Sequence, residues 1–440
     1  MADLAERVRS RLDSVPVGVR MGRVASCNGL VIEAIGPDLR LGETCLLDRS
    51  DEAPLLCQAI GFRAGHVLLM PFGATAGIKV GDRLRATDKP LSIPVGERLV
   101  GRVMDAFGRP LDGQGALHVL HHTPVHRAPI PALDREDNDA VLESGVLAID
   151  ALLPLGKGQR IGVFAGSGVG KSTLLGMMTR HVRADVTVIG LVGERGREVV
   201  DFVNGVLGEE GMARAVVVAA TSDEPALVRV HATHAAHAIA EHFRDEGKDV
   251  LLVIDSITRY AMAQREVGLA AGEPPTARGY PPSVFNALPK LVERGGNLRG
   301  KGSLSCVYSV LVEGDDMNEP VADHMRALLD GHIVLSRQMA NRGQLPAIDV
   351  LQSVSRWLSR VTTPDERKLA ERVRKILALY EASRDLIDMG AHQKGANPEL
   401  DRAVDLAPRI YELLIQLPGE GRTRQEGQSA LVSLIGEAAP

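Results

Sequence analysis

The chain has 440 residues, with 51 basic and 56 acidic side chains that leave a net charge of −5. This length predicts two to four domains, and a hydrophobic content of 45% is typical of a globular protein. The acidic balance, with one Trp, five Tyr and seven Phe, argues against a protein built to bind nucleic acid. The four cysteines form no C-x-x-C pair, which argues against a cysteine zinc site and favours a reducing compartment.

The N-terminus is charged and has no apolar secretory core, and no run reaches the ~18 apolar residues of a membrane span. We therefore expect a cytoplasmic protein. Residues 1–20 are expected to form a separate helix, because Leu4, Val8 and Leu12 recur every four residues between charged side chains. This helix is either a docked terminal segment or an apolar stripe that binds a partner protein.

Residues 21–90 have the pattern of β-structure. Short runs at 23–27, 29–34, 44–47 and 67–70 are rich in strand formers and are separated by Gly and Pro. Closely spaced strands with turn signals predict a small antiparallel β-barrel.

Residues 91–362 alternate between strand and helix patterns, which predicts βαβ units and a mainly parallel sheet covered on both faces. The expected strands are 159–164, 185–192, 215–220, 250–255, 306–312 and 332–336, and the expected helices are 171–182, 197–207 and 225–244. Residues 363–440 are expected to form a helical C-terminal domain, with helices at 365–389, 397–417 and 423–435.

The most specific motif begins at Ala165 and reads A-G-S-G-V-G-K-S, between a predicted strand and a predicted helix. This is the context of a phosphate-binding loop, or P-loop, in which glycines let backbone N–H groups surround phosphate oxygens. Lys171 is expected to reach the β- and γ-phosphates of ATP, and Ser172 to offer a hydroxyl to Mg²⁺. The predicted nucleotide-binding residues are Ala165, Gly166, Ser167, Gly168, Val169, Gly170, Lys171, Ser172 and Thr173.

Two carboxylates are candidates for the chemistry beside this loop. Asp255 ends an apolar strand, where a buried charge must be paired or bind a cation, so we interpret it as the Walker B ligand of Mg²⁺, direct or through water. Glu194 follows another strand and could polarise the attacking water. The spacing alone leaves open that Glu194 belongs to a surface ion network with Arg195, Arg197 and Glu198.

Several motifs together resemble the rotary and protein-export ATPase superfamily. They are G-E-R-G-R-E at 193–198, D-S-I-T-R at 255–259 and P-A-I-D-V-L-Q-S-V-S at 346–355. The segment 272–285 resembles the type III protein export ATPases, and residues 260–265 look more flagellar than injectisome. The resemblance implies a RecA-like P-loop core, with ATP and Mg²⁺ as cofactors.

The resemblance also implies roles for single residues. Lys171 and Glu194 match catalytic residues of the family, and Arg356 matches the arginine that a neighbouring subunit inserts at the γ-phosphate. Without the resemblance, Arg356 is one surface arginine among many. Because one chain carries both Glu194 and Arg356, identical copies can complete each other's sites in a head-to-tail ring, for which the family suggests six subunits.

The implied function is ATP hydrolysis that energises the export of flagellar proteins. The partners implied are a regulatory stalk protein at residues 1–20, the export gate, export chaperones and export substrates. We expect no specific nucleic acid partner, and attachment to the inner face of the membrane only through partners. The alternatives are an injectisome ATPase, a rotary synthase subunit and an RNA translocase.

One position departs from the rotary synthases. Their catalytic subunits carry an aromatic side chain against the adenine where this chain has Leu345, so stacking on the base is in doubt and base selectivity is expected to be loose. Tyr380 could supply a ring from the C-terminal domain.

Three further groups are expected to be structural. The first is a set of histidines on one helix, interpreted as packed, and the second is a set of histidines in a solvated loop. The third is an acidic turn, interpreted as solvated, which could alternatively help to arrange the water ligands of Mg²⁺. These groups are His231, His234, His237 and His242; His121, His122 and His126; and Glu313, Asp315 and Asp316.

Overall fold

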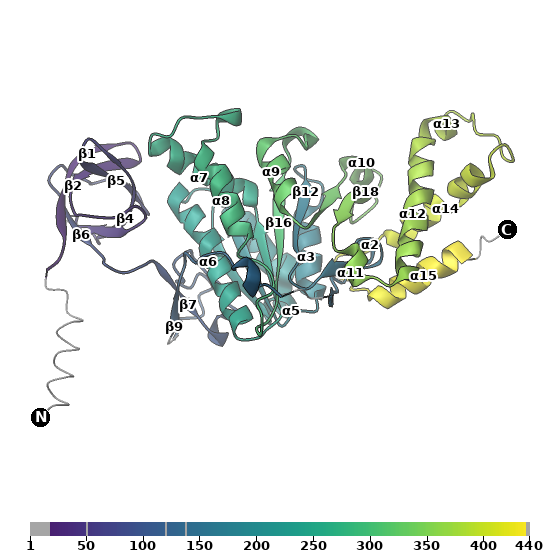
Figure 1. Cartoon of the computed structure of the whole chain (residues 1–440), viewed down its shortest axis with the longest axis horizontal. Helices are drawn as coiled ribbons and strands as arrows, with labels where there is room; N and C mark the ends of the chain where they lie inside the picture. The colour runs from purple at the N-terminus through teal and green to yellow at the C-terminus, as the bar shows by residue number, and fades with distance from the viewer. Residues whose placement is uncertain (1–17, 50–51, 119–120, 137–138, 437–440) are drawn as a thin grey trace, which may run out of the picture.

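The computed structural model describes residues 18–49, 52–118, 121–136 and 139–436, so the predicted partner-binding helix lies almost entirely outside the described residues. Figure 1 shows a small β-barrel, a central layered core and a helical C-terminal part, in that order along the long axis. This architecture confirms the predicted fold class. Within the described ranges, no helix is both long and apolar enough to cross a membrane.

The barrel is antiparallel and closes in the order β1-β2-β5-β4-β3-β6. Side chains alternate between its interior and its surface, as in β1, so that one face of each strand fills the barrel. The expectation missed two strands, β4 and the four-residue β6. The strands are β1 Met21–Asn28, β2 Val31–Ile35, β3 Thr44–Leu47, β4 Leu55–Arg63, β5 His66–Pro71 and β6 Arg83–Ala86.

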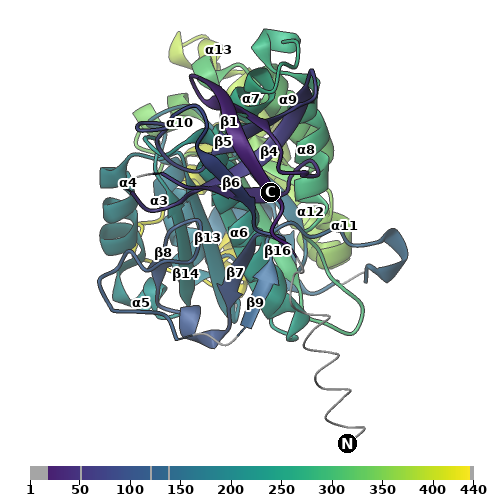
Figure 2. The same ribbon diagram turned by 90° about the vertical axis from the view of Figure 1, so that its left-hand side faces the viewer.

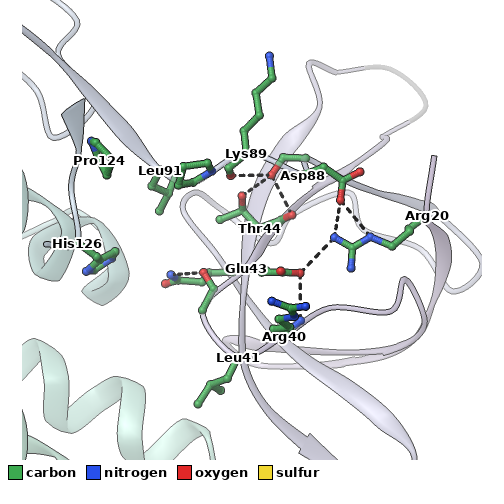
Figure 3. A pocket seen from close by; sticks show the side chains of 14 residues that line it. Arg20, Arg40, Leu41, Glu43, Thr44, Asp88, Lys89, Leu91, Pro124 and His126 are labelled. Carbon is green, nitrogen blue, oxygen red and sulfur yellow. Dashed lines mark hydrogen bonds and ion pairs between the residues drawn. The ribbon is translucent and has the colours of Figure 1, made fainter. Parts of the chain in front are cut away.

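A cluster of charges lies at the end of the barrel where the chain enters and leaves it. Arg20, just before β1, donates from Nε to Asp88 (3.0 Å) and pairs through Nη2 with Glu43 (3.2 Å). Figure 3 shows this guanidinium bridging the two carboxylates. A cavity of about 650 Å³ lies between the barrel and the core, with Pro124 and His126 on the core side. The bridge therefore joins the start of the barrel to the segment that leaves it.

The core is built on an eight-stranded sheet of order β18-β17-β12-β16-β15-β13-β14-β8. Every neighbouring pair is parallel except β17 and β18, which confirms a mainly parallel sheet. The strands β13, β14 and β15 are buried along their whole length, as expected for a sheet covered on both faces. The bounds are β8 Val103–Met104, β12 Arg160–Ala165, β13 Val186–Val192, β14 Ala215–Ala220, β15 Val250–Asp255, β16 Leu304–Leu311, β17 Gly331–Leu335 and β18 Ile348–Ser355.

Two hydrophobic cores cover the two faces of this sheet. Helices α6 to α9 pack on one face, and α2, α3 and the C-terminal helices pack on the other. The helix expected at 197–207 is α4 followed by a π-helical segment at Phe202–Leu207. The core helices are α2 Leu147–Leu152, α3 Lys171–His181, α4 Gly196–Asp201, α5 Gly208–Met212, α6 Ala226–Asp245, α7 Ile257–Ala270, α8 Pro282–Val292, α9 Pro320–Leu328, α10 Arg337–Asn341 and α11 Leu358–Val361.

The C-terminal part contains α12 Pro364–Ala382, α13 Arg384–Asp388, α14 Pro398–Leu414 and α15 Arg424–Gly436. A capping box starts α12, because the Thr363 hydroxyl accepts from the Glu366 N–H while the Glu366 carboxylate accepts from the Thr363 N–H. Asn397 caps α14 in a similar way. Local signals therefore explain where these helices begin.

The histidines expected to pack in a helix and those expected in a loop differ in how well the expectation held. His231 and His237 are buried in α6, and burial lowers the pKa of each to about 3, which confirms the packed helix. His121 and His122 were expected in a loop, and this was wrong. They lie on the two-stranded pair of β9 (His121–Pro124) with β7 (Ser92–Val95), where both side chains are exposed.

Candidate active site

A cavity of about 770 Å³ opens over the carboxyl ends of the central strands. Parallel sheets bind ligands at this edge because the loops that leave several strands converge there. The loop after β12 contributes most of one wall, and the segments after β13, β14, β15, β16 and β17 contribute the rest. The lining residues are Gly166, Ser167, Gly168, Gly170, Lys171, Ser172, Thr173, Gly193, Glu194, Arg195, Glu198, Ser222, Thr258, Arg259, Met262, Leu311, Val312, Glu313, Gly314 and Arg337.

The P-loop has the backbone that its glycines permit. Gly168 and Gly170 have φ angles of 75° and 97°, which strain residues with a Cβ, and Gly170 is the residue that precedes α3. Ala165 and Val169 are buried below the loop, while Ser172 and Thr173 reach solvent in the cavity. The loop therefore turns directly into a helix N-terminus, where the N–H groups and the helix dipole favour an anion.

Lys171 joins the P-loop to both predicted carboxylates. Its ammonium contacts the Asp255 carboxylate directly and lies 3.5 Å from Oε1 of Glu194. The hydroxyl of Ser309, on the neighbouring strand β16, donates to Asp255 Oδ1 at 2.5 Å. Asp255 is almost fully buried, at 2% exposed, so it depends on these two partners for compensation of its charge.

Glu194 has the most perturbed environment of the site. Burial raises its pKa to about 7, with the nearby charge of Asp255 and the carboxyl of Glu198 adding to the rise, while Lys171 opposes it. Its Oε1 atom is buried without a hydrogen-bond partner among the described residues. A buried carboxylate that titrates near neutrality beside a P-loop is suited to accept a proton from water.

The ion pairs of the alternative network are made by the neighbours of Glu194, although the Glu198 carboxyl also lies beside that of Glu194. Arg195 pairs with Glu198, both of them exposed residues of the cavity lining, and Arg197 pairs with Asp201, each pair at 3.5 Å. Glu194 instead pairs inside the cavity, since its one ion pair among the described residues is with Lys171. The side-chain contacts therefore distinguish Glu194, which pairs with Lys171, from its charged neighbours, a distinction that the sequence spacing could not make.

The residues proposed for Mg²⁺ fit a hard cation. Ser172 offers a hydroxyl and Asp255 a carboxylate, and oxygen donors with room for water ligands are what Mg²⁺ prefers. The Oε1 atom of Glu194, which accepts no hydrogen bond from the described residues, adds an acceptor that a bound water can satisfy. Asp255 lies beneath Lys171 and is not itself part of the cavity lining.

Arg356 is not brought to this cavity. It directly follows β18, which runs antiparallel to β17. Because Ser355 pairs with Gly331 and Ile348 pairs with Leu335, Arg356 lies at the amino end of β17, about 13 Å along the strand from the carboxyl end that borders the cavity. Its side chain is exposed and donates a hydrogen bond to the Arg326 carbonyl. Figure 2 shows α3 and α11, the helices next to Lys171 and Arg356, on opposite sides of the core.

Several lining residues were missed by sequence reasoning. Thr258, Arg259 and Met262 come from the start of α7, and Arg337 comes from the start of α10. The D-S-I-T-R motif contained a signal for Arg259, because it follows the Walker B residue by one helical turn. Arg337 had no signal, because only the fold brings the segment after β17 to the P-loop.

Neither candidate for base recognition lines the cavity. Leu345 is 50% exposed beyond it, and Tyr380 packs edge-on against Tyr411 with ring centroids 6.5 Å apart. The acidic turn after β16 does reach the cavity through Glu313, while Asp315 pairs with Arg337 and Asp316 pairs with Arg278. The interpretation of a free solvated loop was therefore incomplete, because salt bridges hold both aspartates.

Comparisons with known proteins agree with this architecture. Residues 24–88 match the ATP synthase alpha/beta family beta-barrel domain, residues 145–355 the nucleotide-binding domain of that family, and residues 362–433 the T3SS EscN ATPase C-terminal domain. The chain is 47% identical to the Flagellum-specific ATP synthase of Bacillus subtilis, over 95% of each chain. It is 46% identical to the SPI-2 type 3 secretion system ATPase of Salmonella typhimurium, also over 95% of each.

Two solved structures share the whole fold. The assembled ATPase EscN from the type III secretion system of enteropathogenic E. coli superposes with a TM-score of 0.89 at 40% identity, covering 94% of this chain and 100% of that one. EscN in complex with its central stalk EscO gives 0.86 at 39% identity, with the same coverage. With a P-loop between a barrel and a T3SS-type C-terminal domain, the chain belongs to the family of type III export ATPases.

Proposed function

We propose that this chain hydrolyses Mg²⁺-ATP at the boundary between two copies of itself, and that this hydrolysis energises the export of flagellar proteins. The observation that carries the proposal is the separation of the chemistry within one chain. Lys171 and Glu194 meet in one cavity, while Arg356 is exposed at the far edge of the same sheet. A complete site then needs the far edge of a second copy.

Within one copy, the P-loop N–H groups and Lys171 bind and neutralise the β- and γ-phosphates. Ser172 and Asp255 would hold Mg²⁺, which supplies further positive charge to the phosphate oxygens. Glu194 orients the attacking water and accepts its proton on the carboxylate. Glu194 must be ionised to accept this proton. Because its pKa is raised to about 7, only part of the protein has an ionised Glu194 at neutral pH.

The second copy contributes Arg356. A guanidinium at the γ-phosphate stabilises the charge that develops on the equatorial oxygens during transfer. Contacts that join unlike faces of identical copies form a ring when the rotation closes, and we propose a ring of six. The assembled state of EscN, a relative of known structure, supports this arrangement.

We propose that residues 1–20 bind a regulatory stalk protein, and that the export gate, export chaperones and export substrates are the other partners. The complex of EscN with its stalk EscO supports a stalk partner. On this proposal the protein works in the cytoplasm at the inner face of the membrane, attached through partners.

The flagellar assignment is the one that we propose, with virulence secretion as the alternative. Flagellum-specific relatives and secretion ATPases have similar identity to this chain, at 47% and 46%. The motif at 260–265 favours the flagellar class. Expression in a bacterium that lacks its flagellar ATPase tests this assignment: restored swimming supports it, and rescue only of injectisome secretion contradicts it.

A mixing experiment tests the shared site. Glu194→Gln removes the proposed base, and Arg356→Ala removes the proposed trans cation, so each pure variant should bind ATP but hydrolyse it poorly. In a 1:1 mixture, about a quarter of the boundaries join an intact Glu194 to an intact Arg356 if copies assemble at random. The mixture should therefore regain about a quarter of the wild-type rate.

The matched control is the double variant Glu194→Gln/Arg356→Ala mixed with either single variant. Such a mixture contains either no intact Glu194 or no intact Arg356, so it cannot form a complete site and should stay inactive. Failure of the two single variants to complement, under conditions in which the wild type assembles, contradicts a site shared between copies.

A further inference from the structure

One arginine ties the P-loop to the acidic turn on the other side of the cavity mouth. Arg337 donates from Nη1 to the Ser167 carbonyl at 3.1 Å, and its Nε pairs with Asp315 Oδ2 at 3.1 Å. Ser167 is in the P-loop, Asp315 is in the turn after β16, and Arg337 begins α10 after β17. The bridge therefore fastens three segments that are far apart in sequence.

The bridge lies directly against the P-loop backbone. A Cβ at Gly166 would lie 2.3 Å from Asp315 Oδ1 and 2.6 Å from Arg337 Nη2. Gly166 does not have a positive φ, unlike Gly168 and Gly170, so its backbone does not itself require glycine. A side chain at 166 would instead have to displace the ends of Asp315 and Arg337, because the ion pair occupies the space into which it would project.

The hydrogen bond to Ser167 suits the geometry of an anion-binding loop. Such a loop directs its N–H groups toward the phosphates, and its carbonyls then point outward and need donors of their own. Arg337 supplies a charged donor to one of these carbonyls. The contact therefore supports the side of the loop that faces away from the phosphates.

The ion pair changes the charge at the cavity mouth. The turn carries Glu313, which lines the cavity, and Asp315, which touches the loop that binds phosphates. A carboxylate so close to a triphosphate repels it, and Arg337 offsets this charge where it arises. Both partners are about half exposed, so the repulsion is partly screened by water and salt.

We propose that Arg337 is a positioning residue that supports the outer side of the P-loop and neutralises Asp315, so that the acidic turn can border the cavity without weakening nucleotide binding. The proposal rests on the proposed function only in taking this cavity as the triphosphate site. It predicts a defect in ATP affinity and not in the chemical step, because Arg337 acts on the loop and not on the reacting atoms.

The test compares Arg337→Ala, Asp315→Asn and the double variant by the KM and kcat for ATP and by direct binding of a fluorescent ATP analogue. Arg337→Ala should raise KM about five-fold, as expected for a partly screened charge near several phosphate charges, with kcat within about two-fold. Asp315→Asn should leave KM unchanged or lower it. The double variant should return to within about two-fold of wild type, because the unpaired carboxylate is gone.

Arg337→Lys keeps the charge and should stay within about two-fold of wild type. The control is Arg342→Ala, at the other end of α10, whose guanidinium is 4.0 Å from Glu381 and outside the cavity lining. It should leave KM unchanged. Melting temperatures without nucleotide show whether any variant has lost its fold.

The proposal is overturned if Arg337→Ala leaves KM unchanged, if Asp315→Asn raises KM as much as Arg337→Ala does, or if the double variant stays as weak as Arg337→Ala. The last two patterns would indicate a structural ion pair without an effect of charge on the nucleotide. A failed mixing experiment would refute the shared site and still leave these binding measurements interpretable, because they need only one copy's P-loop.

Discussion

Replacing Lys171 by Met tests whether the charges of the site are balanced as the structure indicates. The Met side chain keeps most of the volume and removes only the ammonium that contacts Asp255 and Glu194. Among the described residues, Asp255, which is 2% exposed, then has only the Ser309 hydroxyl as a side-chain partner. Removing one partner of a buried pair costs about 3–5 kcal/mol, because the other charge is left uncompensated.

For the nucleotide-free protein, such a loss lowers the melting temperature by about 6–20 °C, at about 2–4 °C per kcal/mol for a large domain. The loss should be larger at pH 8 than at pH 5. Lys171 is the group that holds down the pKa of Glu194, so without it that pKa rises above its present value of about 7. When the pKa of a carboxyl is higher in the folded than in the unfolded protein, its ionisation destabilises the fold. This loss begins as the pH rises above the pKa of the unfolded state, and it is complete above the pKa of the folded state.

The measurement is thermal unfolding of wild type and Lys171→Met at both pH values, with Lys171→Met/Asp255→Asn as the rescue. The double variant should recover at least half of the loss at pH 8, since Asn can keep a hydrogen bond to Ser309 without a charge. An equal loss at both pH values, or no recovery in the double variant, would refute the reasoning.

Two further predictions concern the pH dependence of turnover and the packing of α3. The kcat should rise as the pH increases through about 7, because Glu194 must lose its proton to act as the base. Glu198→Gln should move this rise to lower pH, because it removes a carboxyl that raises the pKa of Glu194. A pH–rate profile from pH 5.5 to 9 measures both effects, and an unmoved profile in the variant contradicts the interaction between the two carboxyls. Gly176→Ala should destabilise the protein by about 1–3 kcal/mol, because its Cβ would lie 1.8 Å from Val206 Cγ1. Adding Val206→Ala in the same chain should relieve most of that loss. Urea unfolding measures the stability of each variant, and a double variant whose loss equals the sum of the two single losses would contradict the clash.

Much of this protein could be predicted from short stretches of sequence. The P-loop is a contiguous segment whose glycines, lysine and flanking strand and helix are all local, and the same holds for the capped helices α12 and α14. The burial of β15 on both faces was visible in the unbroken apolar run at 250–254. These features depend on backbone geometry and hydrophobic pattern within a few residues, so they need no tertiary information.

Tertiary structure decided what depends on side chains that are distant in sequence. It pairs Glu194 with Lys171 inside the cavity, while Arg195 and Glu198 pair with each other at its exposed side, a choice that the spacing left open. It also placed Arg356 at the edge opposite Lys171, because β18 runs antiparallel to β17 and returns the chain across the sheet. The bridge from Arg337 to Ser167 exists only because parallel pairing brings β17 beside β12, a contact between segments that no local pattern encodes.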